Sequence, residues 1–563
     1  MKNMLSVLPM LPFGLFLLSS LAATLFAGRL GRRVAQWSVG FAVLATLAAL
    51  FELALYWRVG EPRWLGGAAH WGSLYLDPLS SVMSVVVASI SLVVHVYSVR
   101  YMAEEPGYAR FYILLDLMTA AILLMVAAGD LITLLVSWHL VGIVLYFLLG
   151  HDMSRQASQR YAFWALITYR FGDLPLVLAA VLLYQAYGTL ALPELFGQIA
   201  SHPGATSLFG LPLTETVGLL VALAAFARSA QFPLHNWLPY TMEGPTPVSA
   251  LMHAGIVNAG GFLVNRFAPL FVHTHTVLHL VFAVGLITAV LGSVLMLTQN
   301  DIKKSLGYST MGQMGFMFVE CGVGAFSLAI YHLIAHGLFK GTMFLGAGGV
   351  IGDARRHDGV PHEDVYTFVV ERKADTSRLP WLVAAIITVV VPFAILGFSH
   401  WLVSGDFVGQ QGAVILLFFG WATGAQLLLA THRLQADSPL RQMAMIILSL
   451  AIVVVGYTLI EHGFGLFLYP DSVMRNGLYA AASVPLTVFA VMMAILTLAI
   501  VIGWLATWSS QTFYELRPGR LARARLMLYS LVSREFYVAD VHGRMTQLVL
   551  AASRRLNLLL RWV

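Results

Sequence analysis

Long apolar runs alternate with short polar segments along almost the whole chain. About fifteen stretches of roughly 18–25 mostly apolar residues lie between residues 5 and 508, each long enough to cross a hydrocarbon core of about 30 Å. Helices satisfy their own backbone hydrogen bonds in lipid, so a chain that crosses this often must cross as helices. The pattern predicts an all-α, polytopic membrane protein with about 15 transmembrane helices.

The composition agrees with this and excludes several kinds of chemistry. Of 563 residues, 59% are hydrophobic and 11% are charged, whereas soluble proteins carry about 25% charged residues. The first apolar stretch, residues 5–27, is too long for a signal-peptide core and lacks a clear cleavage site, so we expect it to be retained. The single cysteine, Cys321, excludes an internal disulfide, an iron–sulfur cluster and a cysteine-rich zinc site. Since no nucleotide-binding glycine motif occurs either, we expect no cofactor, no metal and no catalysis in this chain.

Basic residues are distributed very unevenly between the two sides of the predicted membrane domain. When successive loops are assigned to alternate sides, one side carries about twenty-five lysines and arginines and the other three. This excess predicts a bacterial inner-membrane protein with a periplasmic N-terminus and a cytoplasmic C-terminus. Arginines in the tail alternate with leucine, valine and tryptophan at helical spacing over residues 541–562, which predicts an amphipathic helix on the membrane surface or on a partner.

Two predicted spans are interrupted at comparable places. One carries Arg228 before Pro233 and Pro239, and the other carries Pro392 before His400. Broken helices in corresponding positions indicate an inverted repeat with an ion path near the middle of the membrane. The longest cytoplasmic loop, residues 352–380, is the expected linker between the halves. The predicted segments are N-terminal helices in 1–105, repeats in 106–275 and 276–435, C-terminal helices in 436–510, and a basic amphipathic tail in 511–563.

The first half contains ionisable residues at membrane depth, where each costs about 2.5–3.5 kcal/mol and indicates function. Histidine has a near-neutral reference pKa, which would suit His139 to a proton relay, although a hydrogen bond between helices explains this residue without any such role. Arg170 and Asp173 share one helical face, either as a static pair or as a switch in which the aspartate alternates between cations. Arg228 does not lose its proton in proteins, so it can hold a carboxylate but cannot relay a proton.

A second series of ionisable residues follows. His253 comes after a Thr246-Pro247 helix start, and His332, His336 and Lys340 are spaced i, i+4, i+8 on one stripe. Two histidines at this spacing can bind zinc, but no third ligand accompanies them. A lysine that can give up its proton when buried, aligned with two histidines, favours a proton wire.

Several motifs resemble those of the antiporter-like subunits of respiratory complex I and of Mrp cation antiporters. Residues 243–254 read EGPTPVSALMHA, residues 229–235 read SAQFPLH, and residues 301–311 read DIKKSLGYSTM. The resemblance covers about residues 70–405 and is strongest to the NuoL and MrpA branch, which also has the GYARFY motif of residues 107–112. It implies two inverted five-helix repeats with broken helices and a chain of buried charges near mid-membrane.

The chain departs from this family where the pumping residues are expected. His139 stands where the family has a glutamate, and Arg228 and His400 stand where it has lysines. The long lateral helix of complex I is not evident in the C-terminal sequence. These features resemble the DabB membrane subunits of two-component inorganic carbon pumps instead. That resemblance implies a partner on the cytoplasmic face, a DabA-like soluble zinc protein similar to β-carbonic anhydrase, which hydrates CO2 to bicarbonate while cations flow through the membrane subunit.

We therefore predict a transporter subunit that conducts protons or Na+ inward and couples this flow to a cytoplasmic partner. A subunit of a redox-driven pump and a non-conducting membrane anchor are the alternatives. The predicted path residues are His139, Asp173, Arg228 and His253 in the first half-channel, with Lys304, His332, His336, Lys340 and His400 in the central connection and outer side.

Overall fold

The computed structural model describes residues 8–65, 72–206, 210–299, 301–346, 439–485 and 520–560, with isolated positions between 391 and 498. This part of the chain is almost entirely helical, and its strands are one short antiparallel pair, β1 (Arg63–Leu65) and β2 (Leu74–Leu76). The predicted all-α membrane fold is confirmed, since eight described helical segments are long and apolar enough to cross a membrane. The predicted spans within residues 347–438 and 486–519 fall almost wholly outside the described residues.

The helices lie in two compact units, of which the first holds residues 1–322, 332–347 and 517–563. The first half of this unit contains α2 (Leu11–Leu30), α3 (Val34–Val59), α4 (Pro78–Tyr101), α5 (Tyr108–Val126), α6 (Leu131–Leu149), α7 (Gln156–Tyr187), α8 (Leu192–Ser201) and α9 (Leu213–Arg228). It continues with α10 (Trp237–Tyr240), α11 (Thr246–Ala254), α12 (Ala259–Arg266), α13 (Ala268–Phe271), α14 (Thr276–Leu297), α15 (Ile302–Gly322), α24 (Arg520–Ser533) and α25 (Val538–Leu560). Of α16 (Phe326–Gly346), the residues from 332 onward belong to this unit.

Side-chain caps fix where two of the spans begin. Asp77 accepts a hydrogen bond from the backbone N–H of Ser80, and the Ser80 hydroxyl closes a capping box at the start of α4. Asp130 caps α6 in the same way through the backbone N–H of Thr133. Such caps satisfy N–H groups that have no partner inside the helix, which matters most where little water is present.

The first predicted helix interruption is confirmed. α9 ends at Arg228, and an irregular segment with a cis Phe232-Pro233 bond leads into the short α10. The next span is broken as well, because α11 and α12 are separated by a turn at residues 255–258. The second predicted interruption, around Pro392 and His400, lies outside the described residues.

Helices α14 and α15 pack with their backbones in contact. A Cβ atom on Gly315 would overlap the backbone of Ala289, and one on Gly292 would overlap the backbone of Gly312. Small residues that allow close approach are the usual means of packing helices in lipid. The pair therefore forms a rigid element, and α15 bears many of the contacts described below.

A bulky residue at position 315 should separate these helices. We expect Gly315→Leu to lower the free energy of unfolding by about 3 kcal/mol, because overpacking forces backbone shifts in an interface without space. Thermal unfolding of the purified protein in detergent measures this. Gly456→Leu is the control, since a Cβ at Gly456 meets open space, and equal melting temperatures of the two variants would contradict the prediction.

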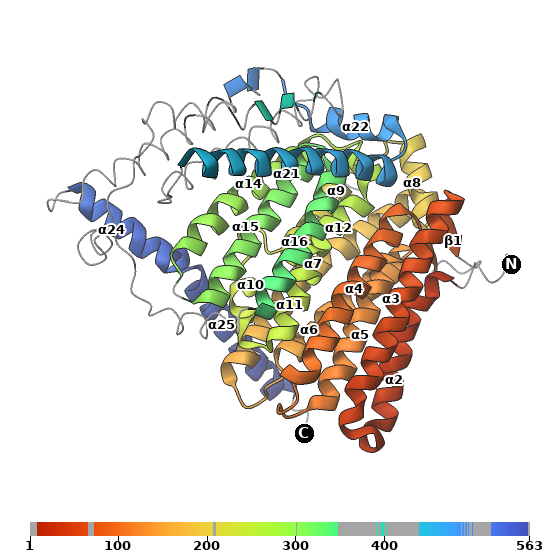
Figure 1. Ribbon diagram of the computed structural model, residues 1–563, viewed down its shortest axis with the longest axis vertical. Helices are drawn as coiled ribbons and strands as arrows, with labels where there is room; N and C mark the ends of the chain where they lie inside the picture. Colours follow the sequence, from red (N-terminus) through yellow and green to blue (C-terminus); the bar gives the residue numbers. More distant parts are fainter. Residues whose placement is uncertain are drawn as a thin grey trace. The chain divides into compact units, whose positions relative to one another are not determined.

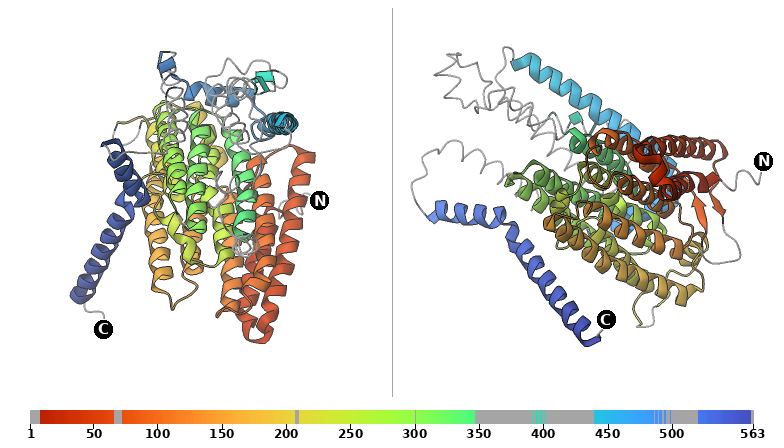
Figure 2. Two further views of the ribbon diagram at one scale, coloured as in Figure 1. Left: turned by 60° about the vertical axis from the view of Figure 1, so that its left-hand side comes forward. Right: turned by 90° about the horizontal axis from the view of Figure 1, so that it is seen from below.

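The C-terminal segment forms two helices that meet at the 3-10 turn Glu535–Tyr537. The predicted amphipathic helix is confirmed as α25, which leads away from the helices of the first unit toward its C-terminal end (Figure 2). The C-terminal end of α25 and the arginine-rich turn between α2 and α3 lie toward the same end of this unit (Figure 1).

The second compact unit holds residues 323–331 and 348–516. Its described part includes α21 (Pro439–Leu468) and α22 (Ser472–Ala482). Asp471 caps α22 through the backbone N–H of Val473. Gly324, with φ +88°, lies so close to the backbone of Leu478 that a side chain would not fit.

Candidate functional site

Three neighbouring helices bring the first group of predicted residues together. His139 from α6 lies with its Nδ1 2.9 Å from Asp173 Oδ2 of α7. Asp173 also pairs with Arg170 one turn before it at 2.9 Å and with Arg228 at the end of α9 at 3.6 Å. Arg170 contacts the His139 ring directly. One carboxylate is therefore shared by two guanidinium groups and an imidazole; we call these four residues the first cluster.

Arg228 is held by aromatic faces as well as by charge. Its side chain is 1% exposed, and its guanidinium carbon lies 4.4 Å from the Trp138 ring centroid and 4.1 Å from that of Tyr169. It donates to the Trp138 carbonyl oxygen at 2.6 Å, while its second terminal nitrogen has no hydrogen-bond acceptor among the described residues. Aromatic faces attract a buried guanidinium, so this environment stabilises a permanent cation that is only partly paired.

The sequence next to these residues makes room for them. Gly142 lies one turn after His139, and a Cβ there would come within 2.7 Å of Arg170 and 3.4 Å of Arg228. Pro175, inside α7, removes one helical N–H donor close to Asp173. His139 is half-exposed within the described residues, whereas Asp173 and Arg228 are buried.

Helix α15 contacts the second group of predicted residues. We call this group, His253, His332, His336 and Lys340, the second cluster. His253 of α11 lies with its Nδ1 3.1 Å from the Thr310 hydroxyl and stacks on Phe344 of α16 with ring centroids 4.3 Å apart. Lys340 is 2% exposed and donates to the Ser309 hydroxyl at 2.7 Å. The lysine therefore has a neutral partner, which leaves its charge uncompensated by any described carboxylate.

His332 has a partner that the sequence interpretation missed. Its Nδ1 lies 2.9 Å from Glu320 Oε1, and its Nε2 lies 3.0 Å from Gln313 Oε1, both on α15. The two histidine rings at 332 and 336 have centroids 6.3 Å apart, and neither nitrogen of His336 has a hydrogen-bond partner in the part of the chain that the structure describes. Glu320 lies inside an apolar run, and the cost of a carboxylate at membrane depth was the signal that could have found it.

Of the nine predicted path residues, three lie in the first cluster and four in the second, which leaves Lys304 and His400. No hydrogen bond or ion pair between described side chains joins Arg228 to His253. Lys304 lies at the first turn of α15 and pairs with Glu535 of the C-terminal segment. His400 lies outside the described residues. The roles of all nine residues in ion movement stay predictions.

A buried pair in the N-terminal helices was also missed. His95 Nε2 lies 3.0 Å from Asp116 Oδ1, both side chains are fully buried, and the hydroxyls of Ser19 and Ser38 donate to the same carboxylate at 2.8 and 2.7 Å. His95 Nδ1 lies 2.7 Å from the Ser91 carbonyl oxygen, which can only accept. Both ring nitrogens thus face oxygen atoms, and the Asp116 carboxylate joins α2, α3, α4 and α5 in one network.

We expect this pair to be structural. Asp116→Leu should lower the free energy of unfolding by about 3–5 kcal/mol, because removing one member of a buried ion pair leaves the other unpaired. Ser38→Ala, which removes a single donor, should cost about 1 kcal/mol. Thermal unfolding in detergent compares them, and an Asp116→Leu melting temperature equal to that of the parent would contradict the assignment.

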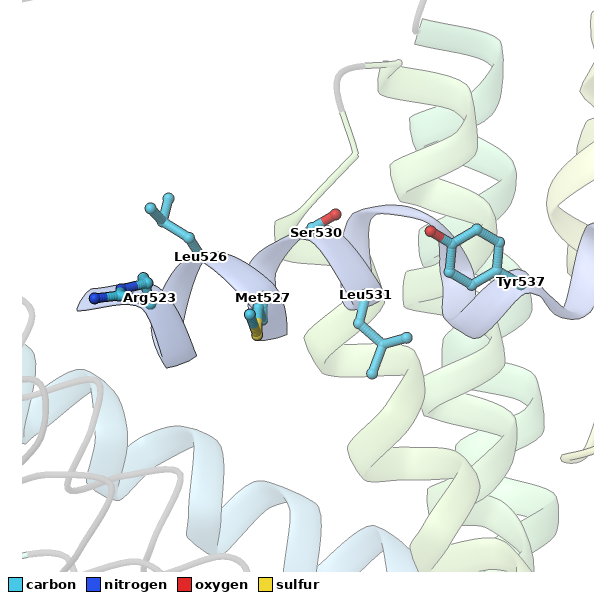
Figure 3. A pocket seen from close by; sticks show the side chains of 6 residues that line it. All are labelled: Arg523, Leu526, Met527, Ser530, Leu531 and Tyr537. Carbon is cyan, nitrogen blue, oxygen red and sulfur yellow. The ribbon is translucent and has the colours of Figure 1, made fainter. Parts of the chain in front are cut away.

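Two further features were considered as candidate sites, a metal-binding group and a surface groove. Among the residues that the structure describes, no group of three or more histidine, cysteine, aspartate or glutamate side chains could hold a metal ion. A shallow open groove of about 410 Å³ follows α24 (Figure 3) and is lined by Arg523, Leu526, Met527, Ser530, Leu531 and Tyr537. None of the predicted path residues lines this groove.

The family model described as "NADH:quinone oxidoreductase/Mrp antiporter, TM" matches residues 128–399, and that of "NADH-Ubiquinone oxidoreductase (complex I), chain 5 N-terminus" matches residues 69–112. A Halothiobacillus neapolitanus protein named "Probable inorganic carbon transporter subunit DabB1" is 60% identical over 563 residues, all of both chains. The chain belongs to the DabB family. This confirms the predicted resemblance and makes it a member of a family of transporter subunits.

More distant relatives place the DabB family among antiporter-like proteins. Chain 5 of NAD(P)H-quinone oxidoreductase from Picosynechococcus is 38% identical over 62% of this chain and 53% of its own length. The chain thus spans about half the length of such relatives. Two solved structures share the fold. A Dietzia Mrp complex matches with a TM-score of 0.55 at 23% identity over 99% of this chain and 63% of its own. The archaeal membrane-bound sulfane sulfur reductase matches at 0.57 and 18% over 84% of this chain and 99% of its own.

Proposed function

We propose that the chain is the proton-conducting membrane subunit of an energy-coupled inorganic carbon uptake complex. The observation that carries the proposal is the pair of buried charge clusters, one around Asp173 and one along α15, in a chain of the DabB family. Buried ionisable groups are costly in a membrane, and groups whose charge is only partly compensated mark candidate paths for ions or protons. The complex would lie in the bacterial inner membrane, with the N-terminus periplasmic and the C-terminus cytoplasmic.

In this mechanism the first cluster is a switch and the second a relay. Asp173 alternates between Arg170 and Arg228, which changes the potential felt by a proton at His139. Arg228 does not release its proton, so it acts only through its charge. His253, His332, His336 and Lys340 can each bind and release a proton, and Glu320 is added to this relay because it contacts His332. The flow, of protons or Na+, would drive one-way CO2 hydration by a DabA-like zinc protein on the cytoplasmic face.

Two other functions fit some of the findings. A subunit of a redox-driven pump is favoured by the 38% identity to the quinone oxidoreductase chain. A non-conducting anchor is favoured by the absence of a described contact between Arg228 and His253. Mild-detergent purification from the native host, with mass spectrometry and zinc analysis, distinguishes the carbon pump from the redox pump. A single large zinc-containing partner supports the carbon pump, whereas iron–sulfur proteins and sibling antiporter subunits support the redox pump.

Conduction is tested in vesicles that contain the purified complex and an internal pH dye. An inward-driving potential should produce proton influx together with bicarbonate formation, and a protonophore should abolish the bicarbonate formation. The same assay with a sodium gradient tests Na+. Bicarbonate formation that neither the potential nor either ion gradient affects would leave the anchor as the remaining function.

A further inference from the structure

The turn between α24 and α25 has an unusual backbone. Glu535, Phe536 and Tyr537 all have positive φ angles, of 56°, 54° and 59°. For residues with a side chain this left-handed conformation costs roughly 1–2 kcal/mol each. Three successive residues keep it only where surrounding contacts hold them, so this turn stores energy that its contacts must offset.

The holding contacts converge on the Glu535 carboxylate. This side chain, on a residue only 3% exposed, forms an ion pair with Lys304. Its Oε2 accepts a hydrogen bond from the Tyr240 hydroxyl at 2.7 Å. Lys304 Nζ also lies 4.5 Å from the centroid of the Tyr240 ring. We call Glu535, Lys304 and Tyr240 the latch.

The beginning of α25 is anchored and the rest is not. The His542 ring stacks on Trp164 of α7, with centroids 4.6 Å apart and planes 10° from parallel. Burial lowers the pKa of His542, so the neutral ring is the form that stacks. From residue 547 to 560 every α25 residue is exposed, and this part carries Leu548, Leu559, Arg554 and Arg555. It offers apolar and basic contacts to an acidic protein surface.

The latch is joined mechanically to the second cluster by α15. Lys304 stands at the first turn of this helix, and Ser309, the partner of Lys340, lies about 7.5 Å further along at 1.5 Å per residue. Thr310 and Glu320, the partners of His253 and His332, follow on the same helix. Because α15 packs tightly on α14, we expect it to move as a rigid body. A displacement of α15 at Lys304 would therefore change its contacts with Lys340, His253 and His332.

We propose that Glu535 couples partner binding on α25 to the second cluster by making or breaking its ion pair with Lys304. The proposal rests on the proposed function and adds its regulation. Glu535 is a positioning residue that does not carry the ion. An acidic partner surface that pulls on α25 strains the turn, releases Lys304 and lets α15 shift relative to Lys340 and His253. Without a partner the latch stays closed and the path stays shut.

The test compares Glu535→Gln with Asp540→Asn. Both substitutions replace a carboxylate by its amide, but Asp540, five residues away, is exposed whereas Glu535 is buried. Hydrogen exchange of residues 538–546 in the purified full-length chain without its partner reads the latch. Loss of a charge-assisted hydrogen bond should speed this exchange about tenfold or more in Glu535→Gln, with a clearly smaller change in Asp540→Asn, whose exposed carboxylate only favours the first turn of α25. Adding the partner to the wild-type chain should also speed the exchange, and anionic lipid vesicles alone should not.

Ion flux in vesicles reads the function of the latch. Glu535→Gln should conduct without the partner and lose carbon uptake while it still binds the partner, an effect that a purely structural contact would not produce. Lys304→Gln should behave in the same way. If both variants take up inorganic carbon at the wild-type rate and show no ion leak, the proposal is overturned. It is also overturned if neither variant accumulates as folded protein in the membrane while Asp540→Asn does.

Two further outcomes separate the possible failures. If the wild-type complex carries no ions, the proposed function fails. In that case, if hydrogen exchange of residues 538–546 does not change when the partner binds, the proposed release of Glu535 is overturned as well. Faster exchange on partner binding supports this release. If anionic vesicles alone give the full change in exchange, the lipid surface is the occupant of α25 and the proposal is overturned.

Discussion

Asp173→Asn is expected to abolish inorganic carbon uptake and to destabilise the chain. The carboxylate is the only described acidic group in contact with Arg170 and Arg228, and Arg228 is almost fully buried. Without it two guanidinium groups face each other uncompensated, which should cost about 3–5 kcal/mol of unfolding free energy. Uptake of labelled bicarbonate and CO2 by cells that carry the complete complex, together with thermal unfolding in detergent, measures both effects.

Asp152→Asn provides a closely matched control. Asp152 pairs with Arg155 at the same i, i+3 spacing, but this pair is exposed at the end of a span. Exposed pairs contribute about 0–1 kcal/mol, so uptake and melting temperature should stay near those of the parent. Equal effects of the two substitutions would mean that the first cluster has no special role.

Lys340→Met is expected to reduce uptake about a hundredfold or more, the range typical for loss of a positioned proton-transfer group, with little change in stability. The lysine is buried, its described partner is the neutral Ser309 hydroxyl, and methionine keeps most of its volume. Loss of uptake with an unchanged melting temperature would separate a role in conduction from a role in folding. Lys303→Met, which changes the neighbour of Lys304, is the control and should retain uptake.

Lys340→Arg distinguishes two roles of the lysine. An arginine keeps its positive charge but does not give up its proton. If Lys340 relays protons, the arginine variant should be as inactive as the methionine variant. If the arginine variant restores uptake, a fixed positive charge suffices at this position and the relay through Lys340 is wrong.

Much of the fold could be predicted because lipid imposes simple rules on sequence. Apolar length predicted the helices, and the prolines after Arg228 predicted the first break. The i, i+3 spacing placed Arg170 and Asp173 on one face, and their contact is present. These features are local, since each depends on residues within a few turns of one helix.

The contacts between distant segments could not be predicted in this way. Glu320 was overlooked because its partner His332 is on the next helix, and the Asp116 network draws donors from three other helices. Lys304 was expected in the central connection, but its ion pair is with Glu535, 231 residues later in the chain. Periodicity says which face a residue occupies and nothing about which helix that face meets.

The aromatic setting of Arg228 bears on which ion can pass. A sodium ion is a hard cation that needs several oxygen ligands. Around Arg228 the described surroundings are the aromatic faces of Trp138 and Tyr169, and the described oxygen atoms, from Asp173 and the Trp138 carbonyl, already face a guanidinium group. A proton needs only one base, and a histidine such as His139, at the half-exposed edge of the cluster, is of the right kind. If the proposed path passes through the first cluster, this setting favours a cation that travels by changing bonds over one that must carry its own shell of ligands.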